Sequence, residues 1–125
     1  MDITPHVARD AKVIQRYGPG RFTISGEVFH GPVVVTPTSV QPFTDRPLPE
    51  WDEAAMAPVL EAEPAVEILL IGTGSAMAPI PPALRALLRS RGIGCDGMDT
   101  GAACRTYNVL LAEGRRVAAV LIAVA

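Results

Sequence analysis

The sequence has little of what several functional classes require. Of its 125 residues, 5% are aromatic, two are cysteine and two are histidine. The formal net charge is -2 and the basic residues form no cluster, so the positive surface that nucleic-acid binding requires is missing. Cys95 and Cys104 lack the close pairing and the histidine partners of a zinc site. These absences predict no nucleic-acid partner, no metal and no cofactor.

Targeting and membrane-spanning patterns are also missing. The apolar run VAAVLIAVA at 117–125 is less than half of the roughly 20 residues that a membrane helix needs. The segment MDITPHVARD at 1–10 has neither the charged start nor the apolar centre of a signal peptide. We therefore expect a cytoplasmic protein with no membrane span.

What the chain does have is enough apolar material for a core. Hydrophobic residues make up 49% and charged residues 19%, which predicts one folded domain over 1–125, with a loose tail at 1–11. In such a core, Cys95 and Cys104 are expected to be reduced, buried small hydrophobes. The alternative is a disulfide, which would need the two Cα atoms to lie within about 7 Å of each other.

The first half of the chain consists of short apolar runs separated by glycine and proline. Glycine and proline favour tight turns, so the pattern predicts an antiparallel meander with strands at 13–17, 22–25, 28–30 and 33–36. Prolines make 38–51 irregular, because each one removes a backbone donor. Asp52 is then expected to cap a helix over 53–61.

The second half alternates apolar strands with amphipathic helices. Strands are predicted at 67–71, 93–96 and 117–124, with helices at 82–90 and from Asp99 to a stop at Gly114. This β-α-β-α-β order favours helices packed on a partly parallel, mixed sheet. The fold class is therefore α/β (α+β mixed): a single compact domain with an N-terminal meander.

Several polar residues near the last helix are unexplained by its apolar face. One interpretation is that a polar recognition patch is formed by Thr100, Arg105, Thr106, Asn108 and Arg115, because Arg105 and Asn108 share a helix face. In the competing interpretation they only support the fold. Arg115 or Arg116 would then pair with Glu113, and Asn108 would bond to a neighbouring loop.

A second candidate is the turn Gly72-Thr73-Gly74, which follows a buried strand. Ligands collect at the carboxyl ends of strands in α/β sheets, and glycines let backbone amides approach an anion. The alternative is a tight turn that needs positive φ. Ser75 lacks the final glycine of a hydrolase elbow, and neither histidine stands in a recognisable relation to it, so no catalytic residue is assigned.

The proline-rich segment from Thr38 to Trp51 offers a third candidate, because it holds the only tryptophan of the chain. Tryptophan is enriched where protein surfaces meet, so Phe43 and Trp51 could dock a partner and would then be partly exposed. The competing interpretation is that Trp51 closes one end of the core.

Three segments carry a resemblance to a known family: GPGRFTISG, EILLIGTG and MDTGAACRTYNVLLAEGRRVAAVLI. With their spacing, these cover nearly the whole chain. They resemble the small α/β, Mth-type domain family that includes mitochondrial complex I assembly factor 3 and many bacterial proteins of unassigned role. The resemblance implies a non-enzymatic assembly or interaction factor with a protein partner, linked to complex I or other membrane-complex biogenesis. It also implies that any association with a membrane is peripheral and runs through that partner. The alternative is a small-ligand-binding protein or enzyme with an anion site at Gly72–Gly74.

Overall fold

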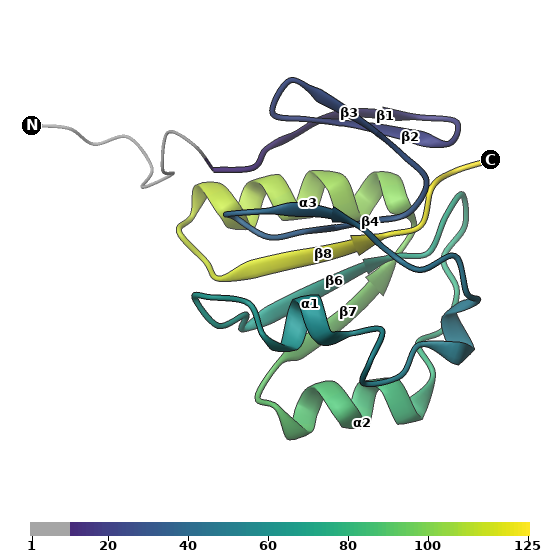
Figure 1. Cartoon of the computed structure of the whole chain (residues 1–125), viewed down its shortest axis with the longest axis vertical. Helices are drawn as coiled ribbons and strands as arrows, with labels where there is room; N and C mark the ends of the chain where they lie inside the picture. Colours follow the sequence, from purple (N-terminus) through teal and green to yellow (C-terminus); the bar gives the residue numbers. More distant parts are fainter. Residues whose placement is uncertain (1–10) are drawn as a thin grey trace, which may run out of the picture.

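The computed structural model describes residues 11–125, so the predicted tail at 1–11 lies outside the described residues except for Ala11, which is 8% exposed. Two sheets and three α-helices make up the domain (Figure 1). A small antiparallel sheet is formed by β1 (Ile14–Gly18), β2 (Arg21–Ile24) and β3 (Glu27–His30). The meander therefore holds three strands, and the run at 33–36 belongs to the larger sheet.

The larger sheet is mixed, as predicted. It has the order β5-β4-β8-β6-β7, with β4 (Val33–Val35), β5 (Val40–Pro42), β6 (Ile68–Gly72), β7 (Gly94–Met98) and β8 (Val117–Leu121). Strand β6 runs parallel to β7 and β8, whereas β4 is antiparallel to β5 and β8. The helices α2 (Pro82–Ser90) and α3 (Thr100–Ala112) connect the parallel strands, which confirms the β-α-β-α-β half.

The ends of α3 lie where the sequence placed them. Asp99 Oδ1 accepts a hydrogen bond from the amide of Ala102 at 2.9 Å, and Gly114 leaves the helix with a φ of +77°. The last strand is shorter than the predicted 117–124. It ends at Leu121, where the pairing with both neighbours stops: Leu121 is paired with Val33, the first residue of β4, and with Gly72, the last residue of β6.

The segment 38–61 departs most from expectation. Residues 38–51 are not wholly irregular, because they contain β5 and a short 3₁₀-helix, η1 (Leu48–Glu50). The helix expected over 53–61 is reduced to α1 (Ala57–Leu60). Asp52 does cap this region by accepting from the Ala55 amide at 2.9 Å, but Pro58 has no amide to continue a helix from 53.

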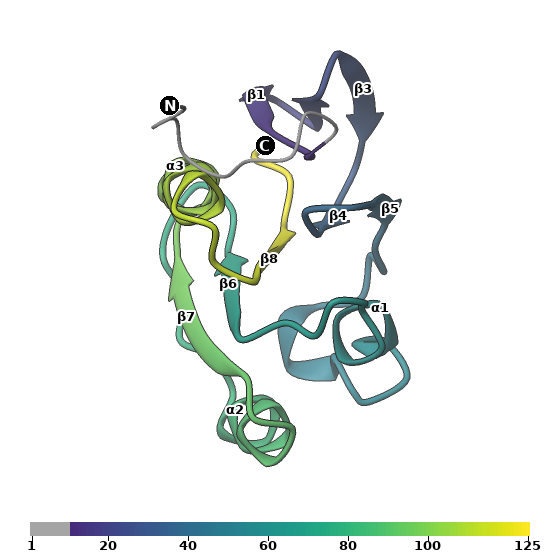
Figure 2. The same ribbon diagram turned by 90° about the vertical axis from the view of Figure 1, so that its left-hand side faces the viewer.

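Hydrophobic side chains alternate between the two faces of the larger sheet and so build two cores. One core includes Val34, Leu69, Ile71 and Val120, and lies against α1 and α2. The other includes Val33, Val35, Leu70 and Val117, and lies against α3 and the small sheet. Figure 2 shows these layers, with α3 and β1–β3 on one side of the sheet and α1 and α2 on the other.

The two cysteines belong to different cores. Cys95 packs against the α2 side of the sheet, while Cys104 is buried on the α3 side. Both thiols are free, as predicted, although Cys95 is half-buried where full burial was expected.

Candidate functional site

The turn Gly72–Gly74 is closed by Thr100, the first residue of α3. The buried Thr100 hydroxyl donates to the carbonyl of Ile122 at 2.6 Å and accepts from the amide of Gly74 at 2.9 Å. The Thr100 amide also donates to the carbonyl of Gly74 at 2.8 Å. One side chain thus joins the ends of β6 and β8 to the start of α3.

Glycine at position 72 is required by this close approach. A Cβ there would lie 2.9 Å from the hydroxyl oxygen of Thr100 and 3.0 Å from its Cα. Gly74 has a φ of +97°, which matches the interpretation as a tight turn. The amide of Thr73 donates to Met98, so the Thr73 and Gly74 amides, which an anion would need, are both bound within the protein. This geometry gives the small-ligand hypothesis no support.

Asn108 fastens the small sheet to α3. Its Oδ1 accepts from the amide of Ile14 at 3.0 Å, and its Nδ2 donates to the carbonyl of Ile14 at 2.7 Å. The neighbouring Tyr107 hydroxyl donates to the carbonyl of Lys12 at 3.0 Å. Asn108 therefore bonds to strand β1, where the sequence interpretation named a loop. The side-chain amide of Asn108 thus forms, at the start of β1, the pair of hydrogen bonds that a neighbouring strand would form.

The residues of the predicted polar patch do not lie together in the structure. Thr100 is fully buried, Asn108 faces β1 and Arg115 lies beyond the far end of α3. Arg105 is exposed on the helix and forms no ion pair within 4.0 Å with any residue in 11–125. Its role as a binding residue stays a prediction.

Arg115 pairs with Glu67 and not with Glu113. Its Nε lies 3.1 Å from Glu67 Oε1, which also accepts from the amide of Arg116 at 3.2 Å. The Arg115 guanidinium, followed by the Arg116 amide, lowers the pKa of the Glu67 carboxyl from its ordinary 4.5. Glu67 precedes β6 and Arg116 precedes β8, so this pair joins the starts of two parallel strands.

The Glu67 pair predicts a pH-dependent contribution to stability. The folded-state pKa lies below the unfolded value, so ionised Glu67 stabilises the fold above the unfolded pKa. This contribution is lost as the pH falls through the lowered folded value. We expect Glu67→Gln to be less stable than wild type at pH 7, and the difference to vanish in acid, when both are followed by urea unfolding. Glu113→Gln is the control, and an equal pH-dependent loss there would contradict the assignment.

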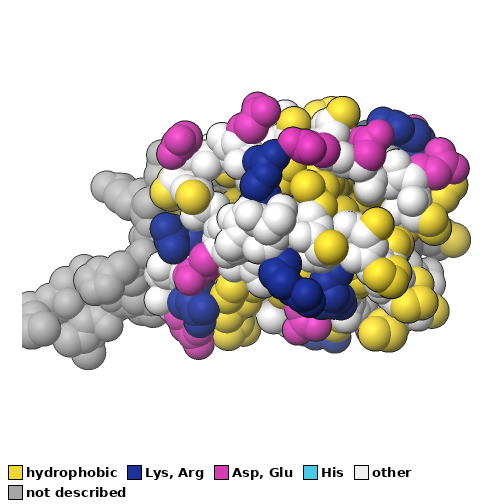
Figure 3. Space-filling view, turned by 90° about the horizontal axis from the view of Figure 1, so that it is seen from below, with side chains coloured by type: hydrophobic (Ala, Val, Ile, Leu, Met, Phe, Trp, Pro, Cys, Tyr) yellow, Lys and Arg dark blue, Asp and Glu magenta, His cyan; other side chains and the backbone are white. Residues whose placement is uncertain are grey.

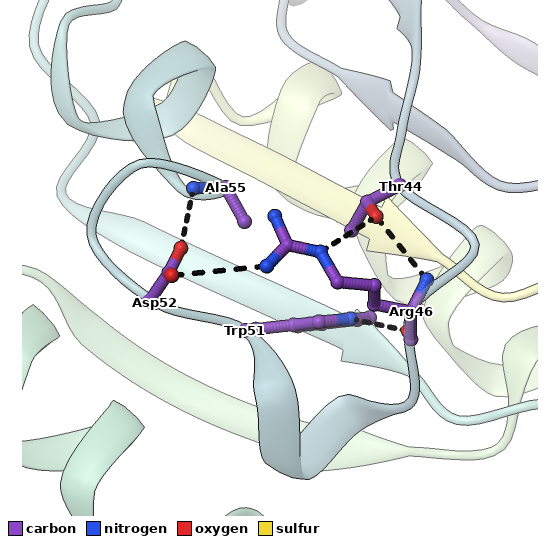
Figure 4. A network of polar contacts seen from close by, with 5 residues as sticks. All are labelled: Thr44, Arg46, Trp51, Asp52 and Ala55. Carbon is purple, nitrogen blue, oxygen red and sulfur yellow. Dashed lines mark hydrogen bonds and ion pairs between the residues drawn. The ribbon is translucent and has the colours of Figure 1, made fainter.

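Phe43 and Trp51 meet inside the α2-side core. They are 9% and 5% exposed, and their rings form an edge-on contact with centroids 4.8 Å apart. The partial exposure expected of a docking pair is therefore absent, and burial agrees with Trp51 closing one end of the core. The Trp51 Nε1 donates to the carbonyl of Arg46 at 2.9 Å, and the Arg46 side chain extends alongside the indole (Figure 4).

Arg46 is a residue that the sequence analysis missed. Its backbone amide donates to Thr44 Oγ1 at 3.1 Å, and its guanidinium lies 3.8 Å from the Asp52 carboxylate (Figure 4). This network orders the segment between β5 and α1. The bond from Ala55, with a smaller contribution from Arg46, lowers the pKa of Asp52 from its ordinary 3.8. The sequence offered one signal for this ion pair, because Asp52 and Arg46 lie close together along the chain.

A basic groove beside β7 was missed as well. Arg85 and Arg89 line a cavity of about 340 Å³ together with Gly92, Ile93, Gly94 and Cys95. Arg85 Nη1 donates to the backbone carbonyl of Cys95 at 3.0 Å, while Arg89 is exposed. The spacing of four between the two arginines places both on one helix face, which is a signal that the sequence did offer.

The two cysteines are not activated thiols. Burial raises the pKa of the Cys104 thiol to about 12, and it also raises that of Cys95. Within residues 11–125, no three side chains of histidine, cysteine, aspartate or glutamate are grouped to hold a metal ion. In the same range, no helix has the length and apolar character needed to cross a bilayer.

Most of the chain is similar in sequence to a known protein family and to named proteins. Residues 14–122 match a family described as "Protein of unknown function (DUF498/DUF598)". An uncharacterised protein of Rhodobacter capsulatus is 38% identical over 109 residues, which are 87% of this chain and 82% of that protein. NADH dehydrogenase [ubiquinone] 1 alpha subcomplex assembly factor 3 of Mus musculus is 34% identical over 112 residues, which are 90% of this chain. The match covers 60% of the length of the mouse protein.

Solved structures share the fold. The crystal structure of an outer membrane protein from Bartonella henselae has a TM-score of 0.82 at 38% identity, covering 98% of this chain and 99% of that one. A Mth938-like domain from Bordetella pertussis, solved by NMR, has a TM-score of 0.75 at 28% identity, covering 98% and 92%. The arrangement of a small antiparallel sheet and a larger mixed sheet is thus the Mth938-like fold.

Proposed function

This chain belongs to the DUF498/DUF598 family, and on that premise we propose that it is a non-enzymatic assembly factor that binds a protein partner during biogenesis of a membrane complex, with respiratory complex I as the first candidate. The observation that carries the proposal is the similarity of most of the chain to complex I assembly factor 3 of the mouse. In this proposal the chain works from the cytoplasm and reaches the membrane through its partner.

The use of polar groups within the fold supports a binding role over catalysis. Thr100, Asn108 and Arg115 all form bonds that hold elements of the fold together. A reaction needs a base, a nucleophile and a site for developing charge within reach of one another. The raised thiol pKa values leave neither cysteine activated as a nucleophile at neutral pH.

The role is tested by deleting the gene for this chain in the cell that makes it. We expect membranes of the deletion strain to lose most of their NADH:quinone oxidoreductase activity, because unassembled complex I subunits accumulate or are degraded. Native gels should show subassemblies in place of the full complex. Affinity capture of the tagged chain, followed by mass spectrometry and cell fractionation, then identifies the partner and where it is bound.

Two controls make the result specific. Succinate:quinone oxidoreductase activity should be unchanged in the same membranes, and the wild-type gene should restore the lost activity. Normal levels of assembled complex I in the deletion strain would reject complex I as the target. Turnover in a broad substrate screen, abolished by Ser75→Ala or Asp99→Asn, would reject the non-enzymatic proposal itself.

A further inference from the structure

Strand β7 forms one edge of the larger sheet, since among residues 11–125 it has β6 as its only neighbouring strand (Figure 2). Hydrogen bonds at its two ends establish which backbone groups face β6. The amide of Gly94 donates to the carbonyl of Glu67 at 2.9 Å, and the carbonyl of Met98 accepts from the amide of Thr73 at 2.8 Å. In a parallel ladder every second residue faces the neighbouring strand, so Gly94, Asp96 and Met98 face β6.

The backbone groups of Cys95 and Gly97 therefore face away from the sheet. The bond from Arg85 to the carbonyl of Cys95 agrees with this direction. The amides of Cys95 and Gly97 and the carbonyl of Gly97 have no hydrogen-bond partner among the described residues. Two of the five β7 residues are glycines, and at Gly97 the face of the sheet is covered by Ile80, whose Cδ1 would lie 2.7 Å from a Cβ there.

Positive charge lies next to the same edge. Neither Arg85 nor Arg89 has a carboxylate within 4.0 Å among residues 11–125, although the chain as a whole carries a net charge of -2. The face that carries α2 shows a group of basic side chains beside hydrophobic ones, with acidic side chains around them (Figure 3). The groove thus combines open backbone donors with charge that an acidic ligand complements.

We propose that the edge of β7 and the Arg85–Arg89 groove bind an extended acidic segment of a partner protein, which adds a strand to the sheet. The added strand takes the outward amides of Cys95 and Gly97, and its carboxylates lie against the two guanidinium groups. The inference rests on the proposed function, because it names the chemistry of the partner that an assembly factor holds.

A second copy of the chain fits this edge less well. Full antiparallel overlap of two β7 strands would place Asp96, the central residue, opposite its own copy. Like charges directly opposite each other destabilise a strand pair. Such pairing would also leave the arginines of both copies without the acidic partner that the groove favours. The charges of this edge therefore select an acidic ligand that differs from β7 itself.

The test uses the intact chain, labelled with ¹⁵N, and three synthetic peptides: acetyl-TEVEVET-amide, its lysine counterpart acetyl-TKVKVKT-amide, and a proline version that cannot form a strand. In the free chain, the amides of Cys95 and Gly97 should exchange with solvent at least about tenfold faster than those of Asp96 and Met98. The acidic peptide should protect both outward amides, whereas the proline and lysine peptides should not.

Charge reversal separates direct contact from a structural effect. Arg89→Glu should lower the affinity for the acidic peptide about tenfold, which is the loss expected for one charge-assisted contact. The same variant should bind the lysine peptide more tightly than wild type does. Arg16→Glu, on the outer strand of the small sheet, is the matched control and should bind both peptides as wild type does. Equal binding of acidic and lysine peptides by wild type would overturn the proposal.

Two further outcomes would also reject the edge. One is slow hydrogen exchange of the Cys95 and Gly97 amides in the free chain together with a dimer in analytical ultracentrifugation. This result would mean that a second copy of the chain occupies the β7 edge. The other is peptide-induced shifts confined to elements other than β7 and α2. Failure of the edge and failure of the assembly role remain separable. If the Arg89→Glu variant no longer binds the peptide but still restores complex I in the deletion strain, only the proposed binding edge is rejected. If complex I is normal after deletion of the gene, only the assembly role is rejected.

Discussion

Replacing Trp51 with alanine is expected to lower the free energy of unfolding by about 3–5 kcal/mol, as for other large aromatic side chains removed from a core. Trp51 is 5% exposed and its ring lies against Phe43 with centroids 4.8 Å apart. The substitution leaves a cavity at one end of the α2-side core and removes the donor to the Arg46 carbonyl. Urea unfolding followed by far-ultraviolet circular dichroism measures the loss without relying on tryptophan fluorescence.

Trp51→Phe separates packing from the hydrogen bond. Phenylalanine keeps a ring against Phe43 and loses Nε1, so we expect a smaller loss of about 1–3 kcal/mol. The docking hypothesis makes the opposite prediction for Trp51→Ala: stability near that of wild type and a loss of affinity for the partner of about tenfold or more. That combination would contradict the core assignment drawn from the burial of both rings.

Thr100→Val is the second substitution with a large expected effect. Valine has nearly the shape of threonine but no hydroxyl, so it leaves the amide of Gly74 and the carbonyl of Ile122 without their partner. An unsatisfied buried group costs about 1–3 kcal/mol, which gives a loss of about 2–6 kcal/mol for the two together. Calorimetry of the variant should show a lower midpoint of thermal unfolding.

Thr100→Ser is the matched control, because it keeps the hydroxyl and loses only a methyl group. We expect it to cost about 1 kcal/mol, the value for one buried methyl. If valine and serine destabilise the chain equally, the two hydrogen bonds contribute little and the junction depends on packing. If valine leaves stability unchanged and abolishes partner capture, Thr100 is a binding residue and the structural assignment is wrong.

The elements that could be predicted from the sequence are those with a strong local pattern. Helix α3 has an aspartate cap, an apolar face and a glycine stop, and both of its ends were predicted to within about two residues. Strand β5 could not be found this way, because Pro42 indicated irregular structure. An edge strand tolerates proline, since its backbone can lack a donor on the open side.

The candidate site shows a second reason why sequence patterns fall short. Thr100 and Asn108 stood out because no apolar pattern explained them, but the sequence could not show what they bind. Asn108 bonds to Ile14, which lies 94 positions away, and Thr100 bonds to Gly74, which lies 26 positions away. Only the folded topology brings such pairs together. A polar residue that the helical pattern does not explain therefore indicates that its side chain forms a hydrogen bond. The pattern does not show whether the partner of that bond belongs to the same chain or to another molecule.

The place of β8 in the sheet has a consequence for how this domain is synthesised. Strand β8 lies between β4 and β6, although it leaves the ribosome after all the other strands of this domain that the structure describes. Until it emerges, β4 and β5 have no link to the parallel part of the sheet, and the apolar faces of both parts stay open. Cotranslational folding can therefore form the β1–β3 hairpins early, while the central sheet closes only in a late, long-range step. During that interval the nascent chain is exposed to chaperones and to aggregation.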